Sequence, residues 1–234
     1  MDGVSIIIPA LNERLNLEQL IPRIASTCDA GNIEWEALVV DSDSTDGTDS
    51  YLEKLSGRLP VRRLNEAVRG DLARAWRRGI EASRYSRIIT MDADLCHTPE
   101  FIPRLLDALE TADLVIASRY LHHRRRQWIK SAPHEIASRL GQRFCRWALR
   151  LPPKDISHGY RAFRKQLYDQ FKNDIKAAGN TFMIALIYYA DRGGFRIREI
   201  PFTYGKRLYG KDHLKISREG IRFLAFTLSV WRKS

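Results

Sequence analysis

Residues 87–94 read Arg-Ile-Ile-Thr-Met-Asp-Ala-Asp, a short apolar run that leads directly into two aspartates. We predict a strand over 87–91, because a short apolar run that ends at polar residues is typical of a strand buried on both faces. The carboxylates of Asp92 and Asp94 stand two residues apart and can converge on one hard cation, Mg²⁺ or Mn²⁺, which prefers oxygen ligands. Alone, the tripeptide fits a solvated turn equally well, so the neighbouring sequence must decide.

Strands and helices alternate on both sides of this stretch. Apolar runs predict further strands over 4–8, 36–40, 61–64 and 113–117. Helical periodicity predicts one helix capped by Asn16, two over 49–55 and 70–83, and one that Pro99 opens. This alternation indicates an α/β fold with a doubly wound parallel sheet, in which ligands bind off the carboxyl ends of the strands. Asp41 and the Asp92/Asp94 pair follow such ends.

The second half of the chain is less regular. We expect a basic amphipathic helix, a strand, an apolar helix, another strand and a final helix, over 133–149, 159–164, 182–191, 196–202 and 216–231. In the final helix we expect four side chains to be exposed to an apolar surrounding, those of Ile221, Phe223, Leu224 and Leu228. Basic amphipathic helices that carry Trp are typical of membrane interfaces, although a helix docked on the protein core fits the 133–149 pattern equally well.

Size and composition fit one domain that spans 1–234. The 234 residues are 44% hydrophobic and 29% charged, which suffices for one sizeable core. The net charge of +11 favours a polyanionic partner, and charge alone leaves open whether this is nucleic acid, an anionic membrane surface or a phosphorylated substrate. Basic residues concentrate in two stretches, 124–150 and 206–222.

Cysteine usage and hydropathy bear on the compartment. Cys28, Cys96 and Cys145 are scattered and odd in number, so we expect free thiols in a reducing, cytosolic setting rather than a disulfide framework. The first residues lack a basic segment followed by a long apolar run, and no stretch reaches the roughly 18 apolar residues of a spanning helix. We therefore expect neither a signal peptide nor a membrane span.

Several motifs occur in order along nearly the whole chain. They are Ile6-Ile7-Ile8-Pro9-Ala10-Leu11-Asn12-Glu13, Asp46-Gly47-Thr48, Asp92-Ala93-Asp94-Leu95, Ala117-Ser118-Arg119-Tyr120, Asp155 with Gly159-Tyr160-Arg161, Glu199-Ile200-Pro201 and Arg207-Leu208-Tyr209-Gly210. With these motifs the chain resembles the family 2 glycosyltransferases, and within them the dolichyl-phosphate mannose synthase branch. The resemblance implies the GT-A fold, a Rossmann-like, doubly wound and mostly parallel sheet with flanking helices and a C-terminal amphipathic helix. Residues 1–120 would form the nucleotide-sugar-binding half of this domain, and 121–234 the acceptor-binding half with helices at the membrane interface.

The resemblance also implies roles for single residues. Those that would line the nucleotide-sugar pocket are Pro9, Ala10, Asn12, Glu13, Asp41, Asp92 and Ala93, with Asp41 reading the base. Asp92 and Asp94 would hold Mg²⁺ or Mn²⁺ on the donor diphosphate. Asp94, Arg119 and Arg207 would be catalytic, the two arginines neutralising phosphate charge. Ser138, Arg139 and Arg161 would bind the acceptor, although a solvated helix charge explains Arg139 equally well.

The kind of acceptor can be inferred from one helix. A phosphate monoester has its second pKa near about 6, so it is already an anionic nucleophile at neutral pH, whereas a sugar hydroxyl needs a positioned base. No acidic residue occurs between Asn180 and Tyr189, and Ala185 stands where the branch often has Glu. The sequence therefore favours a phosphate as the acceptor.

The predicted activity is that of an inverting transferase which moves a hexose, mannose from GDP-mannose, onto a polyprenyl or dolichyl phosphate. Departures from the branch at Ser42, Cys96, His134 and His213 leave the donor and the metal preference open. One alternative is a UDP-sugar transferase that acts on a hydroxyl of a glycan or glycolipid. Another is a catalytically silent, basic nucleic-acid-binding protein, which the acidic motifs disfavour because carboxylates repel phosphate unless a cation intervenes.

The predicted partners are therefore a nucleotide sugar and a polyprenyl phosphate, with no nucleic acid. We expect the protein in the cytoplasm, peripheral at the cytoplasmic face of a membrane and in contact with its anionic surface. The sequence leaves open whether a separate membrane subunit anchors it.

Overall fold

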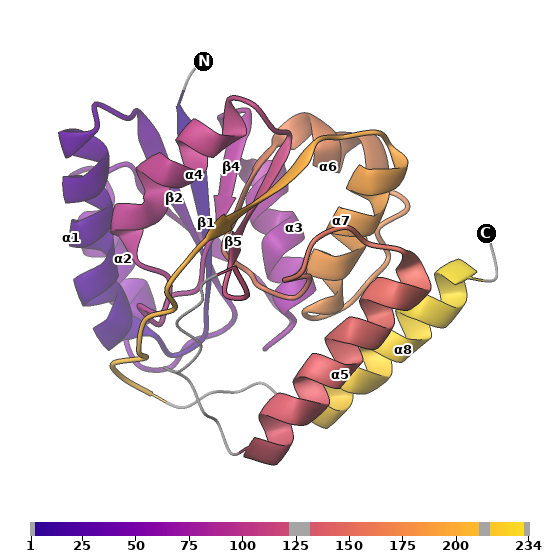
Figure 1. The fold of residues 1–234 in the computed structure, drawn as a ribbon. Helices are drawn as coiled ribbons and strands as arrows, with labels where there is room; N and C mark the ends of the chain where they lie inside the picture. Colours follow the sequence, from indigo (N-terminus) through magenta and orange to yellow (C-terminus); the bar gives the residue numbers. More distant parts are fainter. Residues whose placement is uncertain (1–2, 122–131, 211–215, 232–234) are drawn as a thin grey trace.

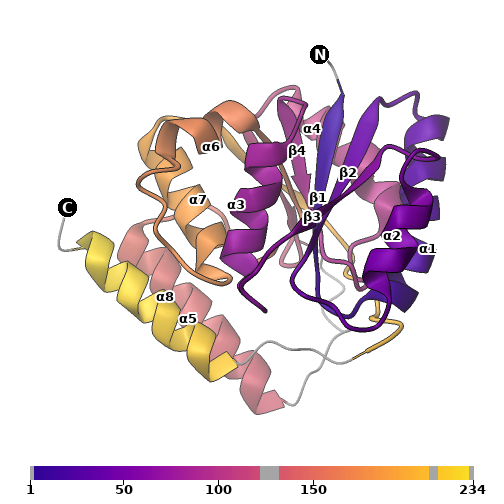
Figure 2. The ribbon, with the colours of Figure 1, turned by 180° about the vertical axis from the view of Figure 1, so that it is seen from behind.

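A central sheet with helices on both faces organises the protein (Figures 1 and 2). The computed structural model describes residues 3–121, 132–210 and 216–231, without the side chains of 132–139, 216–219 and 231. Seven strands lie in the order β3-β2-β1-β4-β6-β5-β7. They span Val61–Asn65 (β3), Trp35–Asp41 (β2), Val4–Ala10 (β1), Arg87–Thr90 (β4), Arg161–Arg164 (β6), Leu114–Ser118 (β5) and Ile197–Pro201 (β7).

The sheet is mostly parallel, as predicted. Only β6 runs antiparallel to its neighbours in this sheet, and because it pairs with both β4 and β5, those two strands still point the same way. The remaining neighbouring strands pair in parallel. The carboxyl ends of six strands therefore share one edge of the sheet, and strands from both 1–120 and 121–234 contribute to it.

The order of winding reverses between the two central strands. From β1 the chain moves outward to β2 and β3, and it then returns to form β4 on the other side of β1. In doubly wound sheets ligands bind at such a reversal, off the carboxyl ends of the strands. Asn12 and Glu13 follow β1 and Asp92 and Asp94 follow β4, so these residues lie on either side of the reversal.

Helices cover the two faces of the sheet separately. One face carries α1 (Arg14–Ala30), α2 (Thr48–Leu55) and α4 (Ile102–Leu109), the last preceded by a 3₁₀ turn over Pro99–Phe101, and the other carries α3 (Leu72–Ala82), α6 (Lys165–Phe171) and α7 (Thr181–Arg192). The helices α5 (Ala132–Leu149) and α8 (Ile216–Trp231) lie side by side next to α7 (Figures 1 and 2). None of the helices in the described ranges is long and apolar enough to cross a membrane.

The apolar run of β1 feeds two cores because successive strand residues face opposite sides of the sheet. Ile6 and Ile8 pack in the core beneath α1 and α4, and Ile7 packs in the core beneath α3. Helix α3 approaches β1 closely at Gly79, where an added Cβ would collide with the side chain of Ile7. A glycine on the apolar face of α3 is therefore a requirement of this packing.

Several local expectations change in the structure. Asn16 was predicted to cap the first helix, and this is wrong, because α1 already begins at Arg14 and Asn16 lies buried within it. Helix α6 was not predicted. Phe223 packs partly against the core, whereas Ile221, Leu224 and Leu228 are exposed, as expected. The three cysteines are free, as expected, and all are buried.

Candidate active site at the carboxyl edge of the sheet

Hydrogen bonds join the loops that follow β1 and β2. The amide of Asn12 donates to Ser44 Oγ at 2.8 Å, and the amide of Thr45 donates to Asn12 Oδ1 at 2.8 Å. Asn12 has a φ of 56°, a left-handed conformation that Asn adopts more readily than most residues. Pro9 and Ala10 end β1 directly before this loop. Of the predicted nucleotide-pocket residues, Pro9 and Ala10 thus end the strand, and Asn12 lies on a loop that hydrogen bonds to the loop after β2 already order.

Asp41 lies at the end of β2 with its carboxylate engaged. The residue is 1% exposed, and its Oδ2 accepts from Nε of Arg63 at 3.1 Å. Its Oδ1 accepts from the amide of Ser44 at 3.1 Å. A carboxylate can accept further hydrogen bonds beyond these, so the base-reading role predicted for Asp41 stays a prediction. Arg63, which orients this carboxylate from β3, was not among the predicted site residues.

The Asp92-Ala93-Asp94 motif follows β4, as the sequence predicted. Asp94 is 7% exposed, and its Oδ1 accepts from the amide of Cys96 at 3.0 Å. The side chain of Asp92 is more open, with 37% of its surface exposed. Ala93 is buried between the two. One aspartate of the pair is thus fixed in the protein, and the other reaches the surface.

Arg207 connects this motif with the loop after β1. Its Nη1 donates to Oε1 of Glu13 at 2.9 Å, and its Nη2 lies 3.2 Å from Oδ2 of Asp94. Burial would lower the pKa of Arg207, but the two carboxylates outweigh burial and raise it. Glu13, Asp94 and Arg207 were predicted from three separate motifs, and the structure brings them into contact.

The segment that carries Arg207 crosses the carboxyl ends of β1 and β4. We call residues 202–210, which follow β7, the crossing segment (Figure 1). The amide of Gly205 donates to the carbonyl of Cys96 at 2.8 Å, and a Cβ at Gly205 would come within 2.9 Å of the carbonyl of Leu95. Asn16 of α1 donates to the carbonyl of Tyr209 at 3.2 Å and accepts from its amide at 3.3 Å. These anchors fix Arg207 over the two acidic residues.

Arg119 lies after β5 and is paired with Asp155. Its Nε and Nη2 each donate to one oxygen of Asp155 at 2.8 Å, a bidentate pair, and its own amide donates to Oδ2 at 3.0 Å. Burial alone would raise the pKa of Asp155, but the charge and hydrogen bonds of Arg119 hold it well below its usual value. Arg119 therefore stays near the carboxyl edge of the sheet with its charge already balanced.

Two buried histidines lie beneath the Asp92 loop, and sequence reasoning missed both. The amide of Asp92 donates to Nδ1 of His97 at 2.8 Å, and Nε2 of His97 lies 3.1 Å from Nε2 of His158. Nδ1 of His158 contacts the carbonyl oxygen of Ala117. Burial is the main cause that lowers the pKa of His97 to about 3 and that of His158 well below 6.5. Both rings are therefore neutral at physiological pH.

The predicted acceptor residues are placed differently. Arg161 is fully buried, and its guanidinium donates to the carbonyl oxygens of His158, Met183 and Ile156. Burial lowers the pKa of Arg161 to about 9. An acceptor could touch this guanidinium only if the surrounding backbone moved, so its acceptor-binding role stays a prediction.

The remaining acceptor-side predictions fall on α5 and beyond. Ser138 and Arg139 belong to α5, but their side chains lie outside the described residues, as do those of His134 and His213. Further along α5, the side chain of Gln142 donates to the hydroxyl of Tyr120 at 3.2 Å. Helix α5 is therefore attached next to Arg119.

The site suits a divalent cation that a ligand helps to hold. Among the described residues no three His, Cys, Asp or Glu side chains converge as a ready-made metal site. Asp92 and Asp94 supply carboxylate oxygens, and Mg²⁺ is usually held by one or two carboxylates together with substrate phosphates and water. The donor set thus fits Mg²⁺ or Mn²⁺ with a diphosphate.

The first two turns of helix α7 carry no carboxylate. Its residues 181–187 are buried in the core, including Ala185 at 0% exposure. The nearby acids Glu13, Asp41 and Asp155 are each engaged by an arginine. This agrees with the expectation that the acceptor needs no strong base, and it leaves that expectation a prediction.

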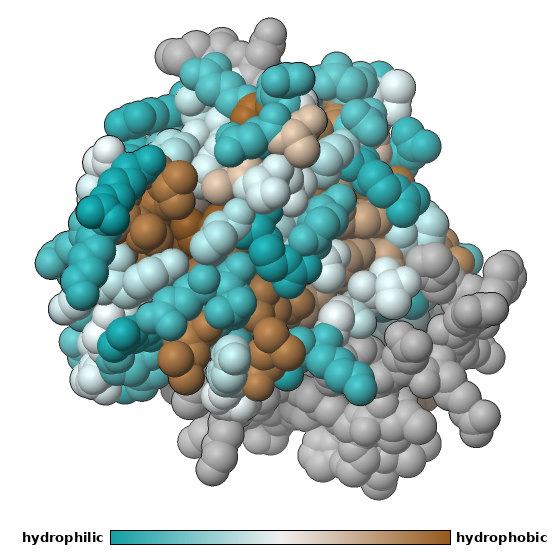
Figure 3. Space-filling view, turned by 90° about the vertical axis from the view of Figure 1, so that its left-hand side faces the viewer, coloured by the Kyte–Doolittle hydropathy of each residue, from teal (hydrophilic) through white to brown (hydrophobic). Residues whose placement is uncertain are grey.

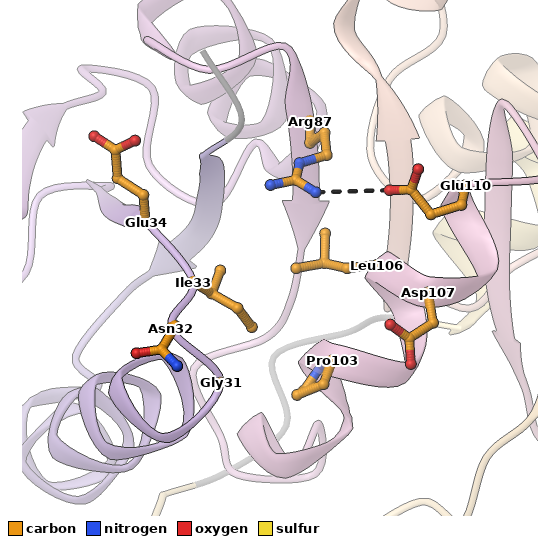
Figure 4. Close-up of a pocket in the computed structure, with 9 residues that line it drawn as sticks. All are labelled: Gly31, Asn32, Ile33, Glu34, Arg87, Pro103, Leu106, Asp107 and Glu110. Carbon is orange, nitrogen blue, oxygen red and sulfur yellow. Dashed lines mark ion pairs between the residues drawn. The ribbon is translucent and has the colours of Figure 1, made fainter.

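An open hollow of about 480 Å³ lies at the opposite edge of the sheet (Figure 4). It is bounded by the turn after α1, by α4 and by Arg87 at the start of β4. Arg87 faces Glu110 across it at 3.8 Å (Figure 4). Because this edge carries the amino ends of the parallel strands, the hollow is separate from the candidate active site.

Known proteins resemble this chain in sequence. The family model of glycosyl transferase family 2 matches residues 5–171. The polyprenol monophosphomannose synthase of Mycolicibacterium smegmatis is 32% identical over 236 residues, which cover 97% of this chain and 85% of that protein. The undecaprenyl-phosphate mannosyltransferase of Micrococcus luteus is 33% identical over 215 residues, covering 89% and 86%. The dolichol-phosphate mannosyltransferase of Pyrococcus furiosus is 32% identical over 221 residues, covering 91% of this chain and 59% of that protein.

Solved structures resemble it in fold. Glucosyl-3-phosphoglycerate synthase from Mycobacterium tuberculosis, in complex with Mn²⁺, UDP-glucose and phosphoglyceric acid, aligns with a TM-score of 0.72 and 23% identity, covering 97% of this chain and 80% of that chain. The same enzyme in complex with Mg²⁺ and UDP aligns with a TM-score of 0.68 and 22% identity, covering 96% and 79%. These structures are less than 25% identical to this chain, so the similarity concerns the fold alone. It shows that the chain has the GT-A fold, as predicted.

Proposed function

This chain belongs to glycosyl transferase family 2, and on that premise we propose that it transfers mannose from GDP-mannose to a polyprenyl phosphate. One observation carries this choice: three mannosyltransferases named for polyprenyl phosphates or their products align with 89% to 97% of the chain. The acidic cluster at the ends of β1 and β4 supports it, because it suits a metal-bound diphosphate. Glu13, Asp92 and Asp94 carry three negative charges against one on Arg207, so a diphosphate would be repelled unless a cation joined it.

Donor binding would use the residues on either side of the winding reversal. Asp92 and Asp94 would hold Mg²⁺ or Mn²⁺, which when bound offsets the negative charge that develops on the departing nucleoside diphosphate. Arg207 would donate to a phosphate oxygen from the position that it now holds beside Asp94. The ordered loops at 11–13 and 42–47, together with the strand ends before them, would enclose the nucleoside, because hydrogen bonds between the two loops already fix their backbone.

The reaction would be a single displacement. A phosphate oxygen of the acceptor attacks the anomeric carbon from the face opposite the diphosphate, the bond from that carbon to the diphosphate oxygen breaks, and the anomeric configuration inverts. Because the acceptor phosphate is already anionic, no side chain has to remove a proton from it. This is consistent with Ala185 on α7 and with the paired state of Glu13 and Asp155.

Contact with a membrane would bring the lipid acceptor to this edge. Apolar side chains are exposed on both outer helices, Leu140, Phe144 and Trp147 on α5 and Ile221, Leu224 and Leu228 on α8. On the side that carries α1, hydrophilic side chains separate the apolar ones into small groups (Figure 3). We therefore propose that α5 and α8 make the peripheral contact with a membrane, which the sequence led us to expect at its cytoplasmic face. A separate membrane subunit is compatible with this arrangement.

Transfer of label from donor to lipid tests the proposal. The protein is incubated with radiolabelled GDP-mannose, Mn²⁺ and a short-chain polyprenyl phosphate, and the label in the organic phase is counted. Parallel reactions contain UDP-glucose, because the structurally similar synthase is bound to UDP-glucose. We expect extractable label with GDP-mannose and none without Mn²⁺. If only UDP-glucose gives extractable label, then UDP-glucose and not GDP-mannose is the donor. If neither donor gives extractable label, the transfer to lipid is refuted.

A further inference from the structure

The candidate active site rests on a hydrogen-bonded chain of two histidines. The amide of Asp92 can only donate, so Nδ1 of His97 must accept, at 2.8 Å. The carbonyl of Ala117 can only accept, so Nδ1 of His158 must donate to it. The hydrogen between the rings therefore lies on Nε2 of His97 and points to Nε2 of His158, 3.1 Å away. The amide of Asp92 and the carbonyl of Ala117 therefore dictate a single pair of neutral tautomers for the two histidines.

The hydrogen-bonded histidines link the ends of two strands that are not neighbours in the sheet. Asp92 follows β4, Ala117 lies in β5, and β6 separates these strands. Ala117 stands two residues before Arg119, and His97 also lies 3.5 Å from Oδ2 of Asp92. A shift of one strand end relative to the other would break one of the three hydrogen bonds between Asp92, His97, His158 and Ala117. The histidines therefore fix the Asp92 loop relative to the Arg119 loop.

Aromatic packing holds the histidine rings in place. The ring of His97 stacks on Tyr160 with centroids 4.8 Å apart and an angle of 11° between planes. Tyr204 of the crossing segment packs edge-on against both histidines, 5.6 Å from His97 and 5.4 Å from His158. Both histidines are at most 3% exposed. The crossing segment that carries Arg207 is thus seated on the same pair of rings.

We propose that His97 and His158 are positioning residues that orient Asp92 for the cation and register it with Arg119 and the crossing segment. The inference rests on the proposed function, because it takes Asp92 as a ligand of the cation on the donor diphosphate. Asp94 is held by the amide of Cys96 and by Arg207, whereas His97 accepts from the backbone amide of Asp92, and its Nε2, with the hydrogen directed to His158, lies 3.5 Å from the Asp92 carboxylate. Groups that orient a metal ligand typically change metal affinity or activity by about 10- to 100-fold when they are removed.

Variants of His97 separate positioning from simple packing. His97→Leu keeps apolar bulk and removes both ring nitrogens, whereas His97→Asn keeps an oxygen where Nδ1 accepts from the amide of Asp92. Free Mn²⁺ is measured by electron paramagnetic resonance as protein is added with GDP present. We expect His97→Leu to bind Mn²⁺ about 10- to 100-fold more weakly than the wild type, and His97→Asn to recover most of this loss. His158→Leu should fall between them.

Controls distinguish the possible failures. Tyr168→Phe is a control outside the site. It removes the hydroxyl of a buried tyrosine, which donates to Glu81 at a distance of 2.8 Å, and it should lower thermal stability without changing Mn²⁺ affinity. Circular dichroism confirms that each variant is folded. If folded His97→Leu binds Mn²⁺ as the wild type does, or if His97→Asn loses as much affinity as His97→Leu, the positioning role is refuted. If the wild type itself fails to bind Mn²⁺ with GDP, the proposed function fails first and the positioning role with it.

Discussion

The carboxyl edge of the sheet and the α5–α8 pair are built from opposite kinds of interaction. At the edge of the sheet, partly buried ionic pairs connect distant motifs, as Arg207 connects Glu13 with Asp94. On α5 and α8, large apolar side chains such as Leu140 and Leu224 remain exposed. Fixed charges stabilise charge at a chosen position, because they need not reorganise when the charge develops. Exposed apolar side chains gain free energy only when an apolar environment covers them.

The difference suggests a division of labour. Changes at the edge of the sheet should alter turnover for every acceptor, whereas changes on α5 and α8 should matter only when the acceptor is presented in a membrane. Each of the following predictions compares the two regions by asking which acceptor, or which measurement, reports the change.

The largest effect is expected from Asp94→Asn. The variant removes a charged oxygen from the predicted cation site, and we expect kcat to fall by on the order of 1,000-fold, because a bound cation contributes several kcal/mol of transition-state stabilisation. Metal-dependent binding of GDP, followed by calorimetry, should disappear as well. Circular dichroism should remain that of the wild type. Activity near the wild-type level would remove Asp94 from the proposed metal site.

A smaller loss is expected from Arg207→Ala. Without the guanidinium, Glu13 and Asp94 lose their shared counter-charge and the leaving diphosphate loses a donor. We expect kcat/KM for the donor to fall by about 100-fold, with the same factor for short-chain and membrane-presented acceptors. Arg207→Lys should retain part of the activity, since lysine keeps the positive charge but lacks the planar guanidinium that donates two parallel hydrogen bonds. A loss confined to membrane-presented acceptor would contradict the assignment.

The matching change on the helices should act on membrane binding. Replacing Leu140 and Leu224 by Ala removes one exposed leucine from each helix, and we expect binding to anionic vesicles to weaken by roughly 10-fold. Sedimentation with vesicles measures this, and turnover of a short, water-soluble acceptor should stay unchanged. Leu15→Ala, which removes a similarly exposed leucine on α1, is the control and should bind vesicles normally. Equal loss in both variants would show that α5 and α8 have no special role.

The last prediction concerns the stability of the fold rather than activity or membrane binding, at mildly acidic pH. Burial lowers the pKa of His97 from 6.5 to about 3 and that of His158 well below 6.5, so between these pH values the unfolded chain binds more protons than the folded protein. The free energy of unfolding should therefore fall as pH drops below 6.5, by up to about 1.4 kcal/mol per pH unit for each histidine. Denaturation without metal from pH 8 to pH 4 measures this slope. His158→Leu should flatten it, and Leu140→Ala should leave it unchanged.

The residues that could be predicted are those whose role is local. The strands and their bounding carboxylates follow from short apolar runs, and so the positions of Asp41, Asp92 and Asp94 at strand ends were predicted correctly. The GT-A fold was implied by the resemblance of the motifs to those of family 2 glycosyltransferases. The cap of α1 was predicted wrongly at Asn16, because its side chain is used by Glu13 and by Tyr209 of the crossing segment. A cap can be recognised locally only when no distant group competes for it.

The sequence by itself determined where each strand lies to within two residues, and therefore which edge of the sheet collects the acidic motifs. Only the tertiary structure decided the partners of those residues, such as Arg207 with Glu13, which stand 194 positions apart, and His97 with His158, which stand 61 apart. It also decided that β6 runs antiparallel and that Arg161 is buried. The physical reason is that a strand end depends on local apolar and polar residues, whereas a contact between side chains depends on which strands become neighbours and in what register.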